Sequence, residues 1–262
     1  MAPGVLHEAW LYFLLWCVKT RKFREVEMKE RICRYLDIAD YILCRYGPLS
    51  FPSWADFEKS GARKLYAGKL RRALPQFATH FGVTPFYAST RNIKHDLVEP
   101  FPIPDGSVDT FQSEDVFEHI ELAKMVSIFN EIYRVLSPAG LFRLSLPDYH
   151  LDLNVERSRK DSDGKIVFDP GGGGQFVDGR IIGGGHVWFP TIEIVRDLFR
   201  DSLFGAGGVV KFLQYNNGDG TFELQSVDYS LGYINRTPDH DDRASNSLRP
   251  ISIVVDAFKS PG

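Results

Sequence analysis

Apolar and polar residues alternate along this chain with two different periods. Apolar residues spaced i, i+3 and i+4 predict amphipathic helices over residues 25–46 and 122–136, and Gly47-Pro48 is typical of a helix end. Strands that alternate with helices are typical of a parallel α/β sheet. The short apolar runs that predict strands are residues 64–67, 81–83, 92–95, 108–112, 141–146, 209–215 and 251–258, and Thr191 is expected to begin a further helix.

Two parts of the chain depart from this alternation. Residues 1–60 contain apolar helical stretches and a proline-containing linker over 49–60, so we expect an N-terminal helical extension ahead of one α/β domain over 61–262. Eight of the 23 glycines lie between Gly171 and Gly185. A stretch so rich in glycine cannot form a core of its own. We therefore expect residues 153–190 to form an inserted lid of loops or hairpins beside a binding site.

The composition narrows the class of protein. Of the 262 residues, 25% are charged and 44% hydrophobic, which is typical of a soluble globular domain. The net charge of -3 argues against a nucleic-acid partner. The cysteines Cys17, Cys33 and Cys44 form no CxxC pair, which fits a reducing compartment better than a zinc site or a disulfide framework. We expect a cytoplasmic protein of enzyme size.

The N-terminal stretch allows two interpretations. Residues 5–18 are rich in tryptophan and leucine but too short to cross a bilayer, which takes about 20 apolar residues. The basic residues of 19–24 follow this stretch instead of preceding it, unlike in a signal peptide. One interpretation is a helix that packs on the core or on a second subunit of a homodimer. The other is a peripheral membrane contact through residues 5–24, with basic residues on anionic lipid.

Four motifs follow one another in the middle of the chain. They are His95-Asp96-Leu97, residues 101–109 (FPIPDGSVD), residues 113–120 (SEDVFEHI) and residues 131–140 (EIYRVLSPAG). In this order and spacing they resemble the class I S-adenosylmethionine-dependent methyltransferases, in the compact methyltransferase-11-like group. The resemblance is strong over residues 92–148. It implies a Rossmann-like fold, a mostly parallel sheet with an antiparallel last strand, and S-adenosylmethionine as the cofactor.

The resemblance also implies where the cofactor is bound. Asp96 matches an acidic residue that accepts the adenine amino group, with a turn cap as the alternative. Carboxylates after the fourth strand suit the positive charges of the methionine part, although a solvated helix start has the same pattern. His119 matches a histidine near the sulfonium, or else it packs beneath a helix. The residues implied in these contacts are His95, Asp96, Leu97, Ser113, Glu114, Asp115 and His119.

Two positions depart from the family pattern. The family's first strand ends in a glycine-rich turn, whereas this chain has Ala67-Gly68-Lys69 with a single glycine. The family's second strand ends in an acidic residue that binds the ribose hydroxyls, whereas this chain offers Thr84, at a cost on the order of 1.5–3 kcal/mol of cofactor affinity. Either the cofactor binds in a modified way, with Lys69 or Arg71 at its carboxylate, or the site has degenerated.

Methyl transfer to a hydroxyl needs a general base. His150 stands beside Asp148 after the fifth strand, where the resemblance implies the acceptor pocket, and His186 precedes the helix that Thr191 begins. These three residues, His186, His150 and Asp148, are the predicted catalytic residues, with loop histidines bonded to backbone as the alternative. The spacing of histidines and acidic residues predicts no metal site.

The expected function is O-methylation of a small-molecule or sugar/glycan hydroxyl by in-line methyl transfer. Relatives with this signature occur in natural-product and polysaccharide biosynthesis, and the aromatic residues of the 153–190 segment suit a sugar or an aromatic ring. The altered first glycine turn suggests an alternative, a catalytically inactive binding module that acts through a partner. A further alternative is an enzyme at the membrane surface that acts on a lipid-linked glycan.

Overall fold

A computed structural model describes residues 25–70, 75–241 and 249–261, and its core is one eight-stranded sheet. The strand order is β11-β10-β12-β5-β4-β1-β2-β3. Strands β1 to β5 pair in parallel, whereas β12 is antiparallel to both of its neighbours. The strands are β1 (Lys64–Ala67), β2 (Phe81–Thr84), β3 (Asn92–Lys94), β4 (Val108–Glu114), β5 (Leu136–Pro147), β10 (Gly208–Asn216), β11 (Phe222–Leu224) and β12 (Ser252–Lys259). The predicted α/β class with an antiparallel last strand is confirmed.

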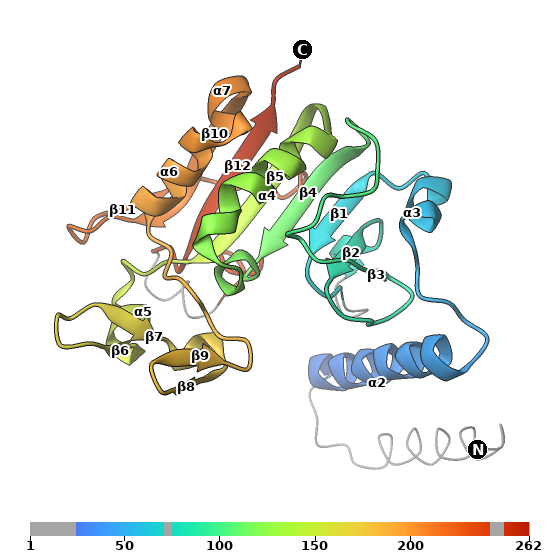
Figure 1. The fold of residues 1–262 in the computed structure, drawn as a ribbon, viewed down its shortest axis with the longest axis horizontal. Coiled ribbons are helices and arrows are strands. Elements are labelled where there is room, and N and C mark those ends of the chain that lie inside the picture. Colours follow the sequence, from blue (N-terminus) through green and yellow to red (C-terminus); the bar gives the residue numbers. More distant parts are fainter. Residues whose placement is uncertain (1–24, 71–74, 242–248, 262) are drawn as a thin grey trace.

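Three helices cover one face of the sheet in front of β4, β5 and β12 (Figure 1). They are α4 (Met125–Val135), α6 (Ile192–Asp201) and α7 (Leu203–Gly207). Their apolar stripes meet in an aromatic core, in which the ring of Phe129 lies 5.2 Å from Phe142 and 4.8 Å from Phe199. Phenylalanine pairs in this geometry stabilise a core by about 0.5–1.5 kcal/mol beyond the burial of their area. Helix α6 therefore holds a fixed position, and the loop that leads into it is anchored.

The opposite face of the sheet is polar beneath a long connection. Because side chains alternate along a strand, Arg143 of β5 and Asp256 of β12 point away from the aromatic core. Both are buried, and Arg143 binds the Asp256 carboxylate through Nε at 2.7 Å and through the second guanidinium nitrogen at 2.6 Å. Arg143 also donates to the carbonyl oxygens of Asp228 and Gly232. This ion pair thus fixes the segment 225–241 on the sheet.

Sequence-based expectations fail in the first half of the sheet. Among the described residues, the connection from β1 to β2 contains only the short 3-10 turn η1 (Pro75–Phe77), and the connection from β2 to β3 contains no α-helix. The predicted alternation of strands and helices is therefore wrong there. Leu70, Phe77 and Tyr66 form a small apolar cluster with Tyr233 of the 225–241 segment, which packs where a helix was expected.

The N-terminal extension contains two helices, α2 (Glu25–Tyr46) and α3 (Trp54–Ser60). The predicted helix 25–46 is confirmed, but the linker expected over 49–60 contains α3. A capping box explains this helix, because Ser53 accepts from the Asp56 backbone N–H and Asp56 accepts from the Ser53 N–H at 2.8 Å. The stretch 5–24, proposed to touch a membrane or a second subunit, lies outside the described residues. Within the described residues, no helix has the length and apolarity needed to span a membrane.

The glycine-rich insertion folds into hairpins beside the carboxyl end of β5 (Figure 1). It pairs β6 with β7 and β8 with β9 as two small antiparallel sheets. Its elements are α5 (Asp152–Arg157), β6 (Arg159–Lys160), β7 (Ile166–Phe168), η4 (Pro170–Gly172), β8 (Gln175–Val177) and β9 (Arg180–Ile182). The insertion therefore lies at the edge where ligands bind in open α/β sheets.

We predict that Asp256→Ala destabilises the fold by about 3–5 kcal/mol, because it leaves the buried Arg143 guanidinium without its carboxylate. Urea unfolding measures the change. As a control, Asp197→Ala removes the exposed pair with Arg200 and is expected to cost less than about 1 kcal/mol. Equal effects of the two substitutions would contradict the assigned role of Arg143 and Asp256.

Candidate active site

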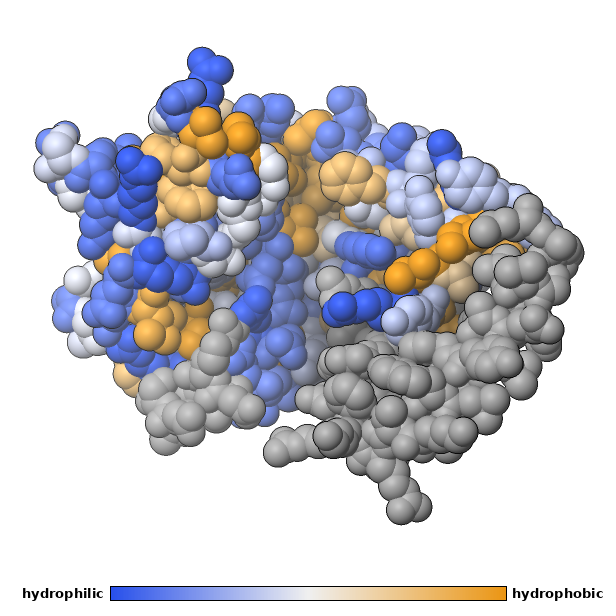
Figure 2. All heavy atoms as spheres, turned by 90° about the horizontal axis from the view of Figure 1, so that it is seen from below, coloured by the Kyte–Doolittle hydropathy of each residue, from blue (hydrophilic) through white to orange (hydrophobic). Residues whose placement is uncertain are grey.

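A cavity of about 470 Å³ opens at the carboxyl ends of β4 and β5. This volume lies within the range of small-molecule sites. Figure 2 views the molecule from this end and shows mostly hydrophilic residues in the middle. The polar residues that line the cavity are Asp115, His119, Asn154, Arg157, His186, Arg236 and Ser252.

Two hydrogen bonds bring the histidines of this cavity together. The Val187 backbone N–H donates to the Glu118 carbonyl oxygen at 2.8 Å, and the Trp188 indole N–H donates to the Phe117 carbonyl oxygen at 3.0 Å. They join the loop before α6 to the 3-10 turn η2 (Phe117–His119) after β4. As a result His186 stands beside His119, with 4.9 Å between ring centroids.

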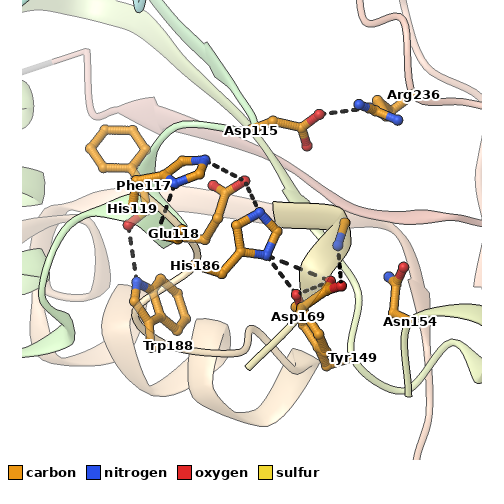
Figure 3. A network of polar contacts seen from close by, with 12 residues as sticks. Asp115, Phe117, Glu118, His119, Tyr149, Asn154, Asp169, His186, Trp188 and Arg236 are labelled. Carbon is orange, nitrogen blue, oxygen red and sulfur yellow. Dashed lines mark hydrogen bonds and ion pairs between the residues drawn. The ribbon is translucent and has the colours of Figure 1, made fainter. Parts of the chain in front are cut away.

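Glu118 lies between the two histidines (Figure 3). Its Oε1 is 3.5 Å from His186 Nε2 and 3.9 Å from His119 Nε2, so neither contact is a hydrogen bond. The side chain is fully buried, and neither carboxylate oxygen has a hydrogen-bond partner among the residues that the structure describes. Burial raises the pKa of Glu118 well above its usual value, and the charge of Asp115 adds to this. The sequence analysis missed Glu118, although it lies next to His119 in the SEDVFEHI motif.

The other side of His186 is held by a chain of hydrogen bonds. His186 Nδ1 is 2.5 Å from the Tyr149 hydroxyl, which donates to Asp169 Oδ2 at 2.5 Å. Asp169 in turn accepts two hydrogen bonds from Arg157, each 2.7 Å long. Burial acts to raise the pKa of Asp169, but the bonds from Arg157 and Tyr149 outweigh it and lower that pKa. Burial, with the nearby His119, lowers the pKa of His186 to about 4, so this ring is neutral at pH 7.

Two glycines of η4 make room for this arrangement. A Cβ on Gly172 would lie 2.4 Å from His186 Cδ2, and a Cβ on Gly171 would lie 2.4 Å from the Arg157 guanidinium carbon. The backbone of the glycine-rich segment thus packs directly against both side chains. The glycines were predicted to give a lid its freedom, and these two allow close approach instead.

Two predicted catalytic residues lie away from the cavity. The buried Asp148 carboxylate accepts from the His150 N–H at 2.9 Å and from the backbone and side chain of Asn216 at 2.6 and 2.9 Å, which joins the ends of β5 and β10. Burial raises the pKa of Asp148. His150 Nε2 lies 2.7 Å from Glu193 of α6. Of the three predicted catalytic residues, His186 is the one that lines the cavity.

The turn after β1 contains one glycine, Gly68, which adopts a backbone conformation that other residues rarely adopt. Ala67 is buried between β2 and β4. Gly68 follows with a φ of +106°, in the left-handed region that favours glycine. The Gly68 N–H donates to the Val83 carbonyl oxygen at 2.7 Å, and an added Cβ would lie 3.2 Å from Val116. Lys69 is exposed, and Arg71 lies outside the described residues. The remaining predicted residue of this region, Thr84, is buried at the end of β2.

The end of β3 is anchored to the N-terminal extension. The ring of His95 packs edge-on against Trp54, with 5.2 Å between centroids. Leu97 is buried in the main core. Asp96 is exposed, and its carboxylate accepts from the Val98 N–H at 3.2 Å, so it caps a turn as the alternative interpretation held.

At the end of β4 three predicted residues have different surroundings. Ser113 is buried with an unpartnered hydroxyl. Glu114 accepts from the Arg236 backbone N–H at 2.7 Å, and Asp115 lies 2.6 Å from the Arg236 guanidinium. Burial raises the pKa of Glu114 to about 7, although the Arg236 N–H opposes the shift.

These residues fit S-adenosylmethionine at the β1 and β4 edge. Gly68 leaves the backbone after β1 without a side chain, Ser113 has a free hydroxyl, and the Asp115 carboxylate lines the cavity beside His119. A carboxylate there suits the ammonium and sulfonium charges. Thr84 leaves the ribose hydroxyls without the family's carboxylate. The cofactor therefore fits with one contact fewer than the family pattern has.

We predict that Glu114 makes stability depend on pH. Its folded pKa of about 7 lies above the ordinary 4.5, so the unfolding free energy falls as pH rises from 4.5 to 7, by up to about 3 kcal/mol. Glu114→Gln keeps an acceptor for Arg236 and removes this fall. Urea unfolding of both proteins below and above this range measures the difference, and parallel pH profiles would contradict the assignment.

The comparisons with known proteins agree with the motif order. Residues 70–144 match the family model of a methyltransferase domain. No curated protein sequence matches the chain. Similar solved structures include a methyltransferase dependent on S-adenosylmethionine from Archaeoglobus fulgidus, at 14% identity and a TM-score of 0.43, with 95% of this chain and 100% of that chain covered.

Two further solved structures are similar. A Mesorhizobium loti methyltransferase has 14% identity and a TM-score of 0.43, with coverage of 79% of this chain and 97% of that one. Haemonchus contortus phosphoethanolamine N-methyltransferase 2, in complex with S-adenosyl-L-methionine, has 14% identity and a TM-score of 0.42, with coverage of 87% and 53%. The family match lies over the segment that carries the motifs, from the turn after β1 into β5. Residues 70–144 thus match a methyltransferase domain, the family of S-adenosylmethionine-dependent enzymes that the motifs resemble.

Proposed function

We propose that this methyltransferase transfers the methyl group to a hydroxyl of a small-molecule or sugar/glycan acceptor held in the cavity at the ends of β4 and β5. The observation that carries the proposal is the neutral, buried imidazole of His186 in the cavity wall. Asn154, Arg157 and Arg236 line the same cavity and offer hydrogen-bond donors to the oxygens of a polyhydroxylated acceptor.

His186 is suited to take the hydroxyl proton. S-adenosylmethionine supplies a methyl group already activated on a sulfonium sulfur, so the chain has to align the acceptor and remove one proton. The Tyr149 hydroxyl donates to Asp169 and therefore accepts from His186 Nδ1, which leaves the lone pair on His186 Nε2. As the oxygen–methyl bond forms and the sulfur keeps the electron pair, the proton passes to Nε2. Such a base contributes typically 10²- to 10⁴-fold.

The direct test has two steps. Calorimetric titration with S-adenosylmethionine and S-adenosylhomocysteine measures cofactor binding, which we expect in the micromolar range. Transfer of labelled methyl to a panel of sugars, glycans and phenols then identifies the acceptor, with mass spectrometry to locate the methyl on oxygen. Methyl found only on nitrogen or carbon would overturn the proposal. No binding up to millimolar cofactor would favour the inactive binding module.

We predict that Asp96→Ala weakens S-adenosylmethionine binding about tenfold or more. The exposed carboxylate at the end of β3 is proposed to accept the adenine amino group, and a hydrogen bond to a charged group is worth about 1.5–3 kcal/mol. Calorimetry measures the change, with Asp163→Ala in the β6–β7 turn as a matched control that should bind normally. An unchanged affinity in Asp96→Ala would show that the adenine lies elsewhere.

A further inference from the structure

The Glu118–His119–His186 cluster brings three hydrogen-bond acceptors together. One ligand atom of each residue lies within 4.8 Å of those of the other two, and both histidines line the cavity. Within the described ranges 25–70, 75–241 and 249–261, both oxygens of the buried Glu118 carboxylate lack a hydrogen-bond partner. An unpartnered buried carboxylate is costly, so its retention at this place requires a favourable interaction.

The hydrogen bonds around the cluster fix which ring atoms face it. His119 Nδ1 lies 3.0 Å from the Gly185 carbonyl oxygen, which can only accept, so this nitrogen carries the proton. His186 Nδ1 donates to the Tyr149 hydroxyl, whose own proton is bound to Asp169. In the neutral rings both Nε2 atoms therefore present lone pairs toward Glu118. With Glu118 ionised, three electron pairs converge without a donor among them, and a bound cation in place of a proton would satisfy them.

We propose that Glu118, His119 and His186 bind a divalent transition-metal ion, of the class of Zn²⁺ or Mn²⁺. Two imidazoles and one carboxylate form a donor set that such ions prefer, whereas Ca²⁺ takes oxygen ligands. Two ligand atoms bound at about 2.1 Å in a tetrahedral arrangement are about 3.4 Å apart. Glu118 Oε1 lies 3.5 and 3.9 Å from the two Nε2 atoms, so small side-chain shifts complete the site.

The surroundings resemble those of histidine ligands in metal sites. Metal-binding histidines usually donate their second N–H to a carbonyl or a carboxylate, which fixes the ring. His119 does so to Gly185, and His186 does so through Tyr149 to Asp169. Gly172 leaves the space that the His186 ring needs, because a Cβ there would lie 2.7 Å from Nε2. These contacts hold both rings in place without the ion.

The open positions of the ion would face the cavity, where the acceptor is proposed to bind. In this respect the inference rests on the proposed function and refines it. With the ion bound, His186 Nε2 would be a ligand, and a hydroxyl oxygen on the ion would have a lowered pKa and would release its proton to water; in the metal-free protein that proton would pass to His186 Nε2. Metal binding itself requires neither cofactor nor acceptor and is tested without them.

The test is calorimetric titration of the full chain, after treatment with a chelator, with Zn²⁺, Mn²⁺ and Ca²⁺. We expect one Zn²⁺ or Mn²⁺ per chain, a rise in melting temperature with that ion, and no binding of Ca²⁺. Glu118→Gln keeps the side-chain volume and removes the charge. It should weaken binding of the ion at least about tenfold, because even residues that only orient ligands contribute 10- to 100-fold. His119→Ala, at a partly exposed position, provides a second variant if Glu118→Gln does not fold.

A matched control is His150→Gln, which alters the exposed His150–Glu193 pair and should keep one bound ion. Melting of the metal-free proteins separates a ligand from a structural residue, because Glu118→Gln should then melt no lower than the native chain. Absence of one-to-one binding, or binding unchanged in both Glu118→Gln and His119→Ala, would overturn the inference. Loss of methyl transfer on chelation would support it, whereas binding without any methyl transfer would overturn only the proposed function.

Discussion

The backbone hydrogen bond from Val187 to Glu118 is the contact on which the candidate site depends. It joins the turn after β4 to the loop before α6, two segments that lie far apart in the sequence. The Trp188 indole adds a second bond to the same turn, and α6 is held on the sheet by the aromatic core. Because both segments are anchored, His186 is fixed beside Glu118 and His119 with little freedom left to lose on binding.

The buried charged side chains behind the sheet differ in their partners from those at its carboxyl edge. Behind the sheet, Arg143 and Asp256 neutralise each other and hold the segment 225–241 in place. At the carboxyl edge, Asp169 is neutralised by Arg157, but Glu118 has no such partner. The ion pairs of Arg143 and Arg157 are thus complete, and among the described residues the unpaired carboxylate lies beside His119 and His186, which line the cavity. A perturbed, unpaired group in a cavity is typical of a functional site.

The two proposals concern the same cavity and assign roles to different parts of its wall, with His186 in both. The β1 and β4 edge, with Gly68, Ser113 and Asp115, is where we propose that the cofactor binds. The insertion contributes Asn154, Arg157 and the glycines of η4, which shape the side where the acceptor is proposed to lie. His119 and His186 stand between these regions. The glycine-rich segment therefore forms part of the cavity wall, and its role as a lid stays a prediction.

The sequence by itself determined the sheet, the motif order and most strand ends, because period-two and period-3.6 patterns report local burial directly. It could not determine α3, whose capping box lies in a proline-containing stretch, or the packing of residues 225–241 where helices were expected. From the sequence we predicted His186, His150 and Asp148 as catalytic residues. The tertiary structure shows that His150 contacts Glu193 and that Asp148 accepts from Asn216. The SEDVFEHI motif contains Glu118, but the contact of Glu118 with His186 depends on segments that are distant in the chain, which no local pattern records.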